Sequence, residues 1–341
     1  MKALRLCILF LLLFLLTGCS LWEETVTVYC VDTATIVHVD GRQMLFSKYE
    51  YDSNGHLLQF NNTHEPKSYT YDSRGNVLSC TFHTSDGQPS HMRLYTYDKQ
   101  DHVLSRQLAD VAGNQYSNTV YTYDRKGNMI AEHHYDEYND LDYYIEMAYD
   151  AAGNRTQFIE YDQDGQEVYR ATMTYDQNNR LIKSVQSPGS DILYTYDTAG
   201  NLVSDESYSK NGTLQHRTVY TCDKYGNLVE EKVVCPEDSL TQTVCVYDEA
   251  GNMLSCKETR STGESFYEWT CDQLGNVLSY KLNENESMVY TYKCFRLPAS
   301  QAAKIMAAQK HLILYREDCK IIPIIPHNYY LNNEYGFIFS Y

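Results

Sequence analysis

Short segments in which aromatic or aliphatic residues alternate with polar ones recur along most of the chain, and clusters of turn-forming residues separate them. Residues 121–130, YTYDRKGNMI, are typical: Tyr121 and Tyr123 flank Thr122, and Met129 follows the polar stretch. A period of two places Tyr121 and Tyr123 on one face of a strand. The pattern therefore predicts short antiparallel strands joined by tight turns.

The same segment occurs ten times, with a spacing of about 26 residues. A weaker second turn lies near the middle of several units, for example at Asp110 and Asp162. Each unit is therefore predicted to hold two strands and two turns, and the repetition indicates a repeat architecture. The aspartates that mark the ten copies are Asp52, Asp72, Asp98, Asp124, Asp150, Asp176, Asp197, Asp223, Asp248 and Asp272.

The third position after each aspartate explains the turn. Eight copies have glycine there, and the other two have Asp101 and Asn179. Glycine, asparagine and aspartate are the residues that best tolerate left-handed backbone angles. Asp-x-x-Gly thus predicts a type I turn followed by a left-handed residue, as in three-residue hairpin loops.

The flanking positions predict how each hairpin packs. In the register that this turn imposes, the fifth residue after the aspartate pairs with the second tyrosine, as Met129 would with Tyr123. The chain has 33 tyrosines and 10 phenylalanines, so the phenol hydroxyl is expected to matter. The rings can be buried with their hydroxyls bonded to backbone or water, or they can form a platform on which sugars stack.

Tyr-x-Tyr-Asp-x-x-Gly-Asn at these spacings resembles the YD repeat of the Rhs family, which includes bacterial toxin shells and teneurins. The resemblance extends from Tyr49 to Tyr292. It implies an all-β fold, a continuous ribbon of antiparallel hairpins over residues 49–293. Some twenty strands exceed the roughly ten that a twisted open sheet tolerates, so we expect a curved sheet, a partial barrel or a spiral shell.

The resemblance also indicates which catalytic features to look for in this chain. Full-length Rhs proteins release a toxin by aspartyl self-cleavage, but this chain contains no Asp-Pro dipeptide. The recurring carboxylates are read as turn residues, and there is no Gly-x-Ser-x-Gly nucleophile elbow. We therefore predict a protein without catalytic residues or a cofactor.

Residues 1–18 are predicted to be a signal peptide, because Lys2 and Arg5 precede an apolar stretch too short to span a bilayer. The following LTGC, which ends at Cys19, resembles the lipobox of bacterial lipoproteins. That resemblance implies a lipid on the sulfur of Cys19 and a place in the cell envelope, outside the cytoplasm. Ser20 implies the outer membrane if the cell is Gram-negative. The alternative is an ordinary secretory signal. Residues 19–48 are then an N-terminal anchor and leading strands.

Charge excludes one class of partner. Without residues 1–18 the chain has 26 Lys and Arg against 45 Asp and Glu, a net charge of −19. Such a surface repels phosphate backbones, so nucleic acid is not an expected partner. The densest acidic stretch holds Asp136, Glu137, Asp140 and Asp142. It lacks the spacing of a calcium loop, and we predict a solvated loop with a cation site as the alternative.

Nine cysteines remain beyond Cys19, and no CxxC or Cys/His spacing predicts a metal site. Export permits one or two disulfides among the six between Cys222 and Cys294, while the alternative is that several are small buried apolar residues. Cys222 and Cys271 favour the alternative, because each replaces a second tyrosine of the repeat. The nine are Cys30, Cys80, Cys222, Cys235, Cys245, Cys256, Cys271, Cys294 and Cys319.

Residues 294–341 leave the repeat pattern and are predicted to be a C-terminal cap, with a helix beginning near Pro298. The alternative is a very small effector domain, with His311 and His327 as its candidate bases. The sequence as a whole predicts a non-enzymatic envelope lipoprotein that binds carbohydrate or another surface polymer. The alternative is a truncated shell or partner component of an Rhs-type toxin system, with a dedicated protein partner.

Overall fold

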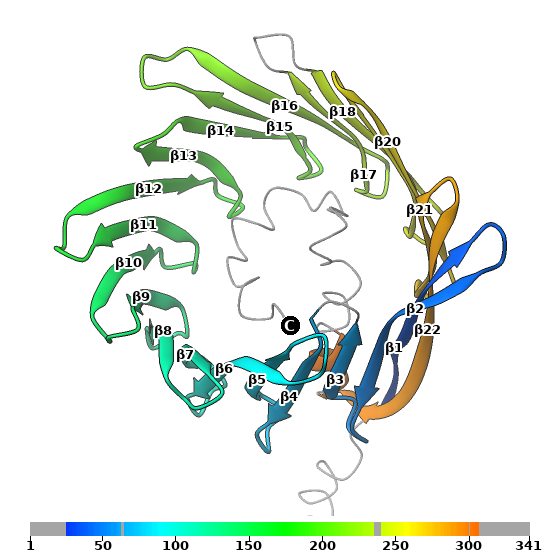
Figure 1. Cartoon of the computed structure of the whole chain (residues 1–341). Coiled ribbons are helices and arrows are strands. Elements are labelled where there is room, and N and C mark those ends of the chain that lie inside the picture. The colour runs from blue at the N-terminus through cyan, green and yellow to red at the C-terminus, as the bar shows by residue number, and fades with distance from the viewer. Residues whose placement is uncertain (1–24, 63–64, 235–239, 300, 307–341) are drawn as a thin grey trace, which may run out of the picture.

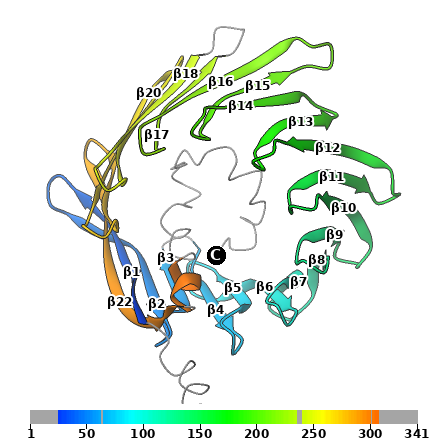
Figure 2. The ribbon, with the colours of Figure 1, turned by 180° about the vertical axis from the view of Figure 1, so that it is seen from behind.

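The structure is a computed structural model that describes residues 25–62, 65–234, 240–299 and 301–306. Within these residues the chain forms twenty-two strands, arranged as a ring (Figures 1 and 2). The strands are β1 (Thr25–His38), β2 (Gln43–Tyr51), β3 (Leu57–Asn62), β4 (Lys67–Tyr71), β5 (Val77–His83), β6 (Pro89–Tyr97), β7 (Val103–Asp110), β8 (Gln115–Tyr123), β9 (Met129–Tyr135), β10 (Leu141–Tyr149), β11 (Arg155–Asp162), β12 (Glu167–Tyr175), β13 (Leu181–Ser187), β14 (Asp191–Tyr196), β15 (Leu202–Tyr208), β16 (Leu214–Cys222), β17 (Leu228–Val234), β18 (Leu240–Tyr247), β19 (Met253–Arg260), β20 (Gly263–Cys271), β21 (Val277–Asn283) and β22 (Glu286–Pro298).

The ring is a single closed antiparallel barrel. Each strand pairs with the next, and β22 pairs with β1 from Thr25 opposite Pro298 to His38 opposite Glu286. The predicted all-β array of antiparallel hairpins is confirmed, but it is more closed than the curved sheet, partial barrel or spiral shell that the sequence predicted. Closure leaves neither β1 nor β22 as an unpaired edge, which removes a site of aggregation. It depends on the first and last strands, which lie outside the ten motifs.

The predicted hairpin turns are confirmed. Gly127 N–H donates to the Asp124 carbonyl at 3.1 Å, and Gly127 has a φ of 87°. The two exceptions at this position, Asp101 and Asn179, have φ values of 69° and 60°. Tyr123 lies opposite Met129, which is the register predicted for the second tyrosine.

Alternate turns lie at opposite ends of the barrel, and we name the two ends. The turn rim is formed by the ten Asp-x-x-Gly turns. The distal rim is formed by the intervening turns, such as those at Asp110 and Asp136. β1 begins and β22 ends at the turn rim, so both ends of the described array lie there. β22 continues to Pro298, past residue 293, the predicted end of the repeats.

A short helix over residues 301–306 packs against the turn rim. Gln301 Nε2 donates to the carbonyl of Asn54 at 3.1 Å, and Lys304 pairs with Asp101 at 3.2 Å. Ile305 is buried with Leu297 beside Gly55. This helix falls where the sequence predicted one. The remainder of the predicted cap, residues 307–341, lies outside the described residues, as do His311 and His327.

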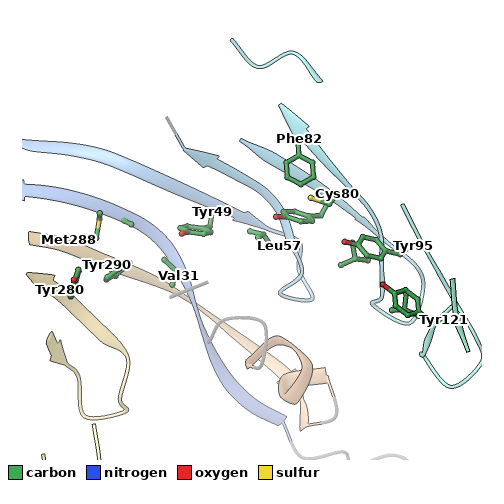
Figure 3. Close-up of a cluster of buried hydrophobic side chains, with 14 of the residues drawn as sticks. Val31, Tyr49, Leu57, Cys80, Phe82, Tyr95, Tyr121, Tyr280, Met288 and Tyr290 are labelled. Carbon is green, nitrogen blue, oxygen red and sulfur yellow. The ribbon is translucent and has the colours of Figure 1, made fainter. Parts of the chain in front are cut away.

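One face of the sheet is buried and the other is exposed. The first tyrosine of the repeat is buried in six copies, for example Tyr49, Tyr95 and Tyr121, which follow one another from strand to strand in Figure 3. The residue five after the aspartate, such as Leu57 or Met129, belongs to the same buried clusters. Alternation places the threonine between the two tyrosines on the exposed face, as at Thr122.

Candidate functional site

The repeated aspartates are fully occupied as turn acceptors. Asp124 Oδ1 accepts the backbone N–H groups of Lys126 and Asn128, at 2.8 and 2.9 Å, and Oδ2 accepts the side-chain amide of Asn128 at 2.9 Å. The hydrogen bond from the Asn128 side chain, together with the backbone bonds, holds the pKa of Asp124 below its ordinary value. The ten carboxylates are therefore structural groups of the turn rim.

The last residue of the motif has a role that sequence reasoning missed. In all ten copies its side chain donates to the aspartate that opens the turn. Asparagine does so in seven copies, and His56, His102 and Arg180 do so in the others. The signal was present in the sequence, because every replacement carries a side-chain N–H.

In seven of the ten units the second tyrosine ties neighbouring turns together. Tyr123 Oη donates to the carbonyl of Val103 at 2.9 Å. With the first tyrosines buried and most of the second tyrosines bonded to backbone, these rings do not form a platform on which sugars could stack, the alternative that the sequence left open. The same bond to the preceding unit is made by Tyr71, Tyr97, Tyr123, Tyr175, Tyr196, Tyr247 and Tyr292, and Tyr51 bonds to Val31.

Across the buried face, one cross-strand pair recurs in every unit. It joins the residue three before the aspartate to the residue eight after it, and we call these ten pairs the pair row. The pairs are Tyr49–Phe60, Tyr69–Cys80, Tyr95–Arg106, Tyr121–Glu132, Met147–Phe158, Met173–Ser184, Tyr194–Asp205, Tyr220–Glu231, Cys245–Cys256 and Trp269–Tyr280.

Charged side chains stand in the pair row on β6 to β9 and on β14 to β17, and the second segment holds the buried carboxylate of Asp205. We therefore treat β14 to β19 as the candidate site for proton chemistry. Asp205 is 5% exposed and accepts a hydrogen bond of 2.6 Å from Tyr220 Oη. Burial, followed by that hydrogen bond, raises the pKa of Tyr220. Glu231 lies opposite Tyr220, and burial, with repulsion from Asp205 and Glu258, raises its pKa too. Chemically, the site can hold a proton among carboxylates or accept hydrogen bonds from a bound donor.

The next pair of the row consists of two thiols. Cys245 on β18 and Cys256 on β19 are buried, and their Sγ atoms are 3.2 Å apart. Sequence spacing did not single out these two, although they stand three before and eight after Asp248. Cys222 and Cys271, which the sequence predicted as small buried residues, take the place of the second tyrosine, opposite Leu228 and Val277, and are half-buried. Cys30 and Cys80 are buried.

The acidic stretch from Asp136 to Asp142 forms an ordinary turn of the distal rim. Asp136 Oδ1 accepts the backbone N–H groups of Tyr138 and Asp140, both at 2.9 Å. Gln115 Nε2 also donates to the carbonyl of Asp136, at 2.8 Å, and so joins this turn to its neighbour. Among the described residues, no three His, Cys, Asp or Glu side chains are placed to hold a metal ion.

Cys19, the residue predicted to carry the lipid, lies outside the described residues, and so do Cys235 and Cys319. In the described part of the chain, no helix is both long and apolar enough to cross a membrane.

No protein-family model and no curated protein matches this chain. Several solved structures are similar at low identity. The complex TcdB2-TccC3-TEV aligns with 74% of this chain at 14% identity and a TM-score of 0.41. TcdB2-TccC3 without its hypervariable C-terminal region aligns with 82% at 13% identity and 0.41. The Tc holotoxin pore of Photorhabdus luminescens aligns with 77% at 12% identity and 0.41. This chain spans only 15 to 17% of the length of those chains.

Proposed function

We propose that the protein is a non-enzymatic, lipid-anchored binding scaffold of the cell envelope. The observation that supports this proposal is the position of both ends of the array at the turn rim. Thr25 lies opposite Pro298 there, and Cys19 precedes Thr25 by six residues. Six extended residues span at most about 22 Å. A lipid on Cys19 would therefore hold the turn rim near the membrane and leave the distal rim free for binding.

The way the repeated polar groups are used supports a role without catalysis. The ten aspartates accept turn hydrogen bonds, and seven of the second tyrosines donate to backbone carbonyls. General acid–base work requires groups that can reach a substrate proton. The repeated aspartates and tyrosines instead make the hydrogen bonds that hold the turns and hairpins together.

For the ligand we propose carbohydrate or another uncharged surface polymer, bound at the distal rim. Tyr116 and Tyr138 are 48% and 76% exposed. Tyr116 lies just after one distal turn and Tyr138 lies within the next, and the bond from Gln115 to Asp136 joins the two turns. Exposed tyrosines offer an apolar ring with a polar tip, which suits a sugar. The net negative charge of the chain argues against an anionic polymer.

Binding of the protein from residue 20 onward to a panel of cell-wall polymers and glycans tests the ligand. We expect retention of at least one uncharged polymer, and a loss of at least fivefold in affinity in Tyr138→Ala and Tyr116→Ala. Tyr225→Ala is the matched control, because Tyr225 is 68% exposed but lies on the turn rim. Equal losses in all three variants would contradict the placement of the site.

The anchor has its own experiment. Wild-type protein expressed with its signal should partition into detergent and carry lipid on the peptide that begins at Cys19, as seen by mass spectrometry. The Cys19→Ser variant should be released in soluble form. A wild-type protein found without lipid would rule out the lipid anchor but would not contradict the proposed binding scaffold.

The second candidate is a partner component of an Rhs-type toxin system, and the YD-repeat sequence is what favours it. A pull-down from native envelope would then recover one dedicated protein, with no retention on any polymer. Recovery of polymer without such a protein would favour the first proposal.

A further inference from the structure

The thiol pair Cys245–Cys256 is unlike the rest of the pair row. The other nine pairs have tyrosine, methionine or tryptophan at the first position, whereas here both positions hold cysteine. The two residues are directly opposite on β18 and β19, with exposures of 3% and 7%. Their Sγ atoms are 3.2 Å apart.

We propose that Cys245 and Cys256 form an intrachain disulfide that locks the β18–β19 hairpin. Directly opposed residues of antiparallel strands have Cα atoms about 4.5 to 5.5 Å apart. That range lies within the Cα separations of about 4.4 to 6.8 Å that disulfides require. The bond thus needs rotation of two side chains and no backbone movement. It rests on the proposed export, because an oxidising compartment lets it persist.

None of the other described cysteines is opposite a second one. Cys30 is buried and lies opposite Lys293, whereas the neighbouring Cys294 is exposed and lies opposite Tyr29. Alternation therefore directs the side chains of Cys30 and Cys294 to opposite faces. Cys80 lies between Tyr69 and Arg93. Within the described residues, the strand register therefore allows one disulfide, between Cys245 and Cys256.

The bond forms by exchange with an external disulfide, either a small molecule or a protein. The thiolate of one cysteine, written here as Cys256, attacks one sulfur of that disulfide, and one thiol leaves. The Cys245 thiol then loses its proton and attacks Cys256 Sγ in the mixed disulfide, which releases the second thiol. Two protein thiols are oxidised and one external disulfide is reduced to two thiols.

The two Sγ atoms share one hydrogen bond, at 3.2 Å. Because the two thiols titrate as a pair, either can make the first attack, and the product is the same disulfide.

Mass spectrometry tests the proposal with a suitable pair of proteases. Cleavage after Lys, Arg and Glu separates three peptides, 233–237 with Cys235, 238–249 with Cys245 and 250–257 with Cys256. The full mature chain is purified reduced, folded, and incubated in a glutathione redox buffer before free thiols are alkylated. We expect peptides 238–249 and 250–257 to be linked and to separate after reduction. Alkylation of both cysteines, or a link from Cys245 to Cys235, would overturn the proposal.

The same digest of protein taken from cells separates this inference from the proposed function. A link found in the redox buffer but absent from cellular protein would support the bond and contradict export. For stability, a reductant should lower the denaturation midpoint of the oxidised wild type, and Cys245→Ser/Cys256→Ser provides the reference without the bond. The double variant itself should not respond to the reductant, whereas Cys222→Ser should respond like the wild type. An equal response of the wild type and the double variant would overturn the proposal.

Discussion

The hydroxyl of Tyr123 donates a hydrogen bond to the carbonyl oxygen of Val103, twenty residues earlier in the chain, at 2.9 Å. Tyr123 stands directly before the turn of one unit, and Val103 directly after the turn of the unit before it. The bond therefore joins successive hairpins at the turn rim. It explains why the repeat specifies tyrosine at this position, since phenylalanine could fill the same volume without making the bond.

Replacement of Tyr123 with phenylalanine should lower the free energy of unfolding by about 0.5 to 1.5 kcal/mol, the usual net value of one such hydrogen bond. The ring contacts are retained, so the loss reports the hydroxyl. Chemical denaturation measures it, with Tyr225→Phe as the control because Tyr225 is exposed. If the two variants have the same midpoint, the bond contributes nothing to stability.

The glycine of the turn meets a requirement for a left-handed backbone angle and, at some positions, a requirement for space. Comparing two glycines distinguishes the two requirements. At Gly153 only backbone angle matters, because φ is 90° and a Cβ would meet nothing within 4 Å. We expect Gly153→Val to cost more than Gly153→Asn, since left-handed angles cost most L residues about 1 to 2 kcal/mol and asparagine less. Thermal or chemical denaturation ranks the two. Equal costs would contradict the turn assignment.

At Gly127 the neighbouring turn adds a steric requirement. A Cβ there would lie 2.8 Å from His102 Nε2, on the side chain that bonds to Asp98. Gly127→Ala should therefore cost more than Gly153→Ala, by roughly 1 kcal/mol for the displaced side chain. Replacing His102 with alanine should remove this difference, and its persistence would show that the contact is not the cause.

Local features of the fold were predictable because each is encoded within a few residues. Asp124 and Gly127 determine their turn, and the turn determines that Tyr123 faces Met129. Once that register is known, residues three before and eight after any aspartate are opposite, so the pairing of Cys245 with Cys256 also follows. The exposed Tyr116 and Tyr138 are not marked by the repeat, and their neighbourhood depends on how adjacent distal turns meet.

Acid should destabilise the barrel through the turn carboxylates. Each of the ten aspartates has a folded pKa below its ordinary value of 3.8; for Asp124 the first cause is the hydrogen bond from Asn128. A lowered pKa in the folded state contributes stability that is fully present above pH 3.8 and is lost as pH falls through the folded value. Unfolding free energy measured between pH 7 and pH 2 should fall steeply below about pH 4.

The matched variant is Asp124→Asn, which keeps an acceptor oxygen but cannot titrate. It should be less stable than the wild type at pH 7, and its loss of stability on acidification should be smaller by the contribution of one group. A pH profile parallel to that of the wild type would exclude Asp124 from the acid response.

Closure of the barrel could not be predicted from the sequence, because it depends on the pairing of β1 with β22, which are separated by most of the chain. Ala34 on β1 lies opposite both Ser47 of β2 and Tyr290 of β22, and it is 1% exposed. Nothing local to Ala34 identifies Tyr290 as its neighbour. The two strands are also longer than most others, with fourteen and thirteen residues, and this length gives the closing pair its extended register.

Proline at position 34 should open the barrel. It removes the backbone N–H of a central strand, and a ladder hydrogen bond with it. The freed strand edges should pair with other molecules, so size-exclusion chromatography with light scattering should show dimers and larger species. Ala34→Ser keeps the N–H and is expected to remain monomeric in the same assay. A monomeric Ala34→Pro with an unchanged denaturation midpoint would mean that the seam between β1 and β22 contributes little to the closed state.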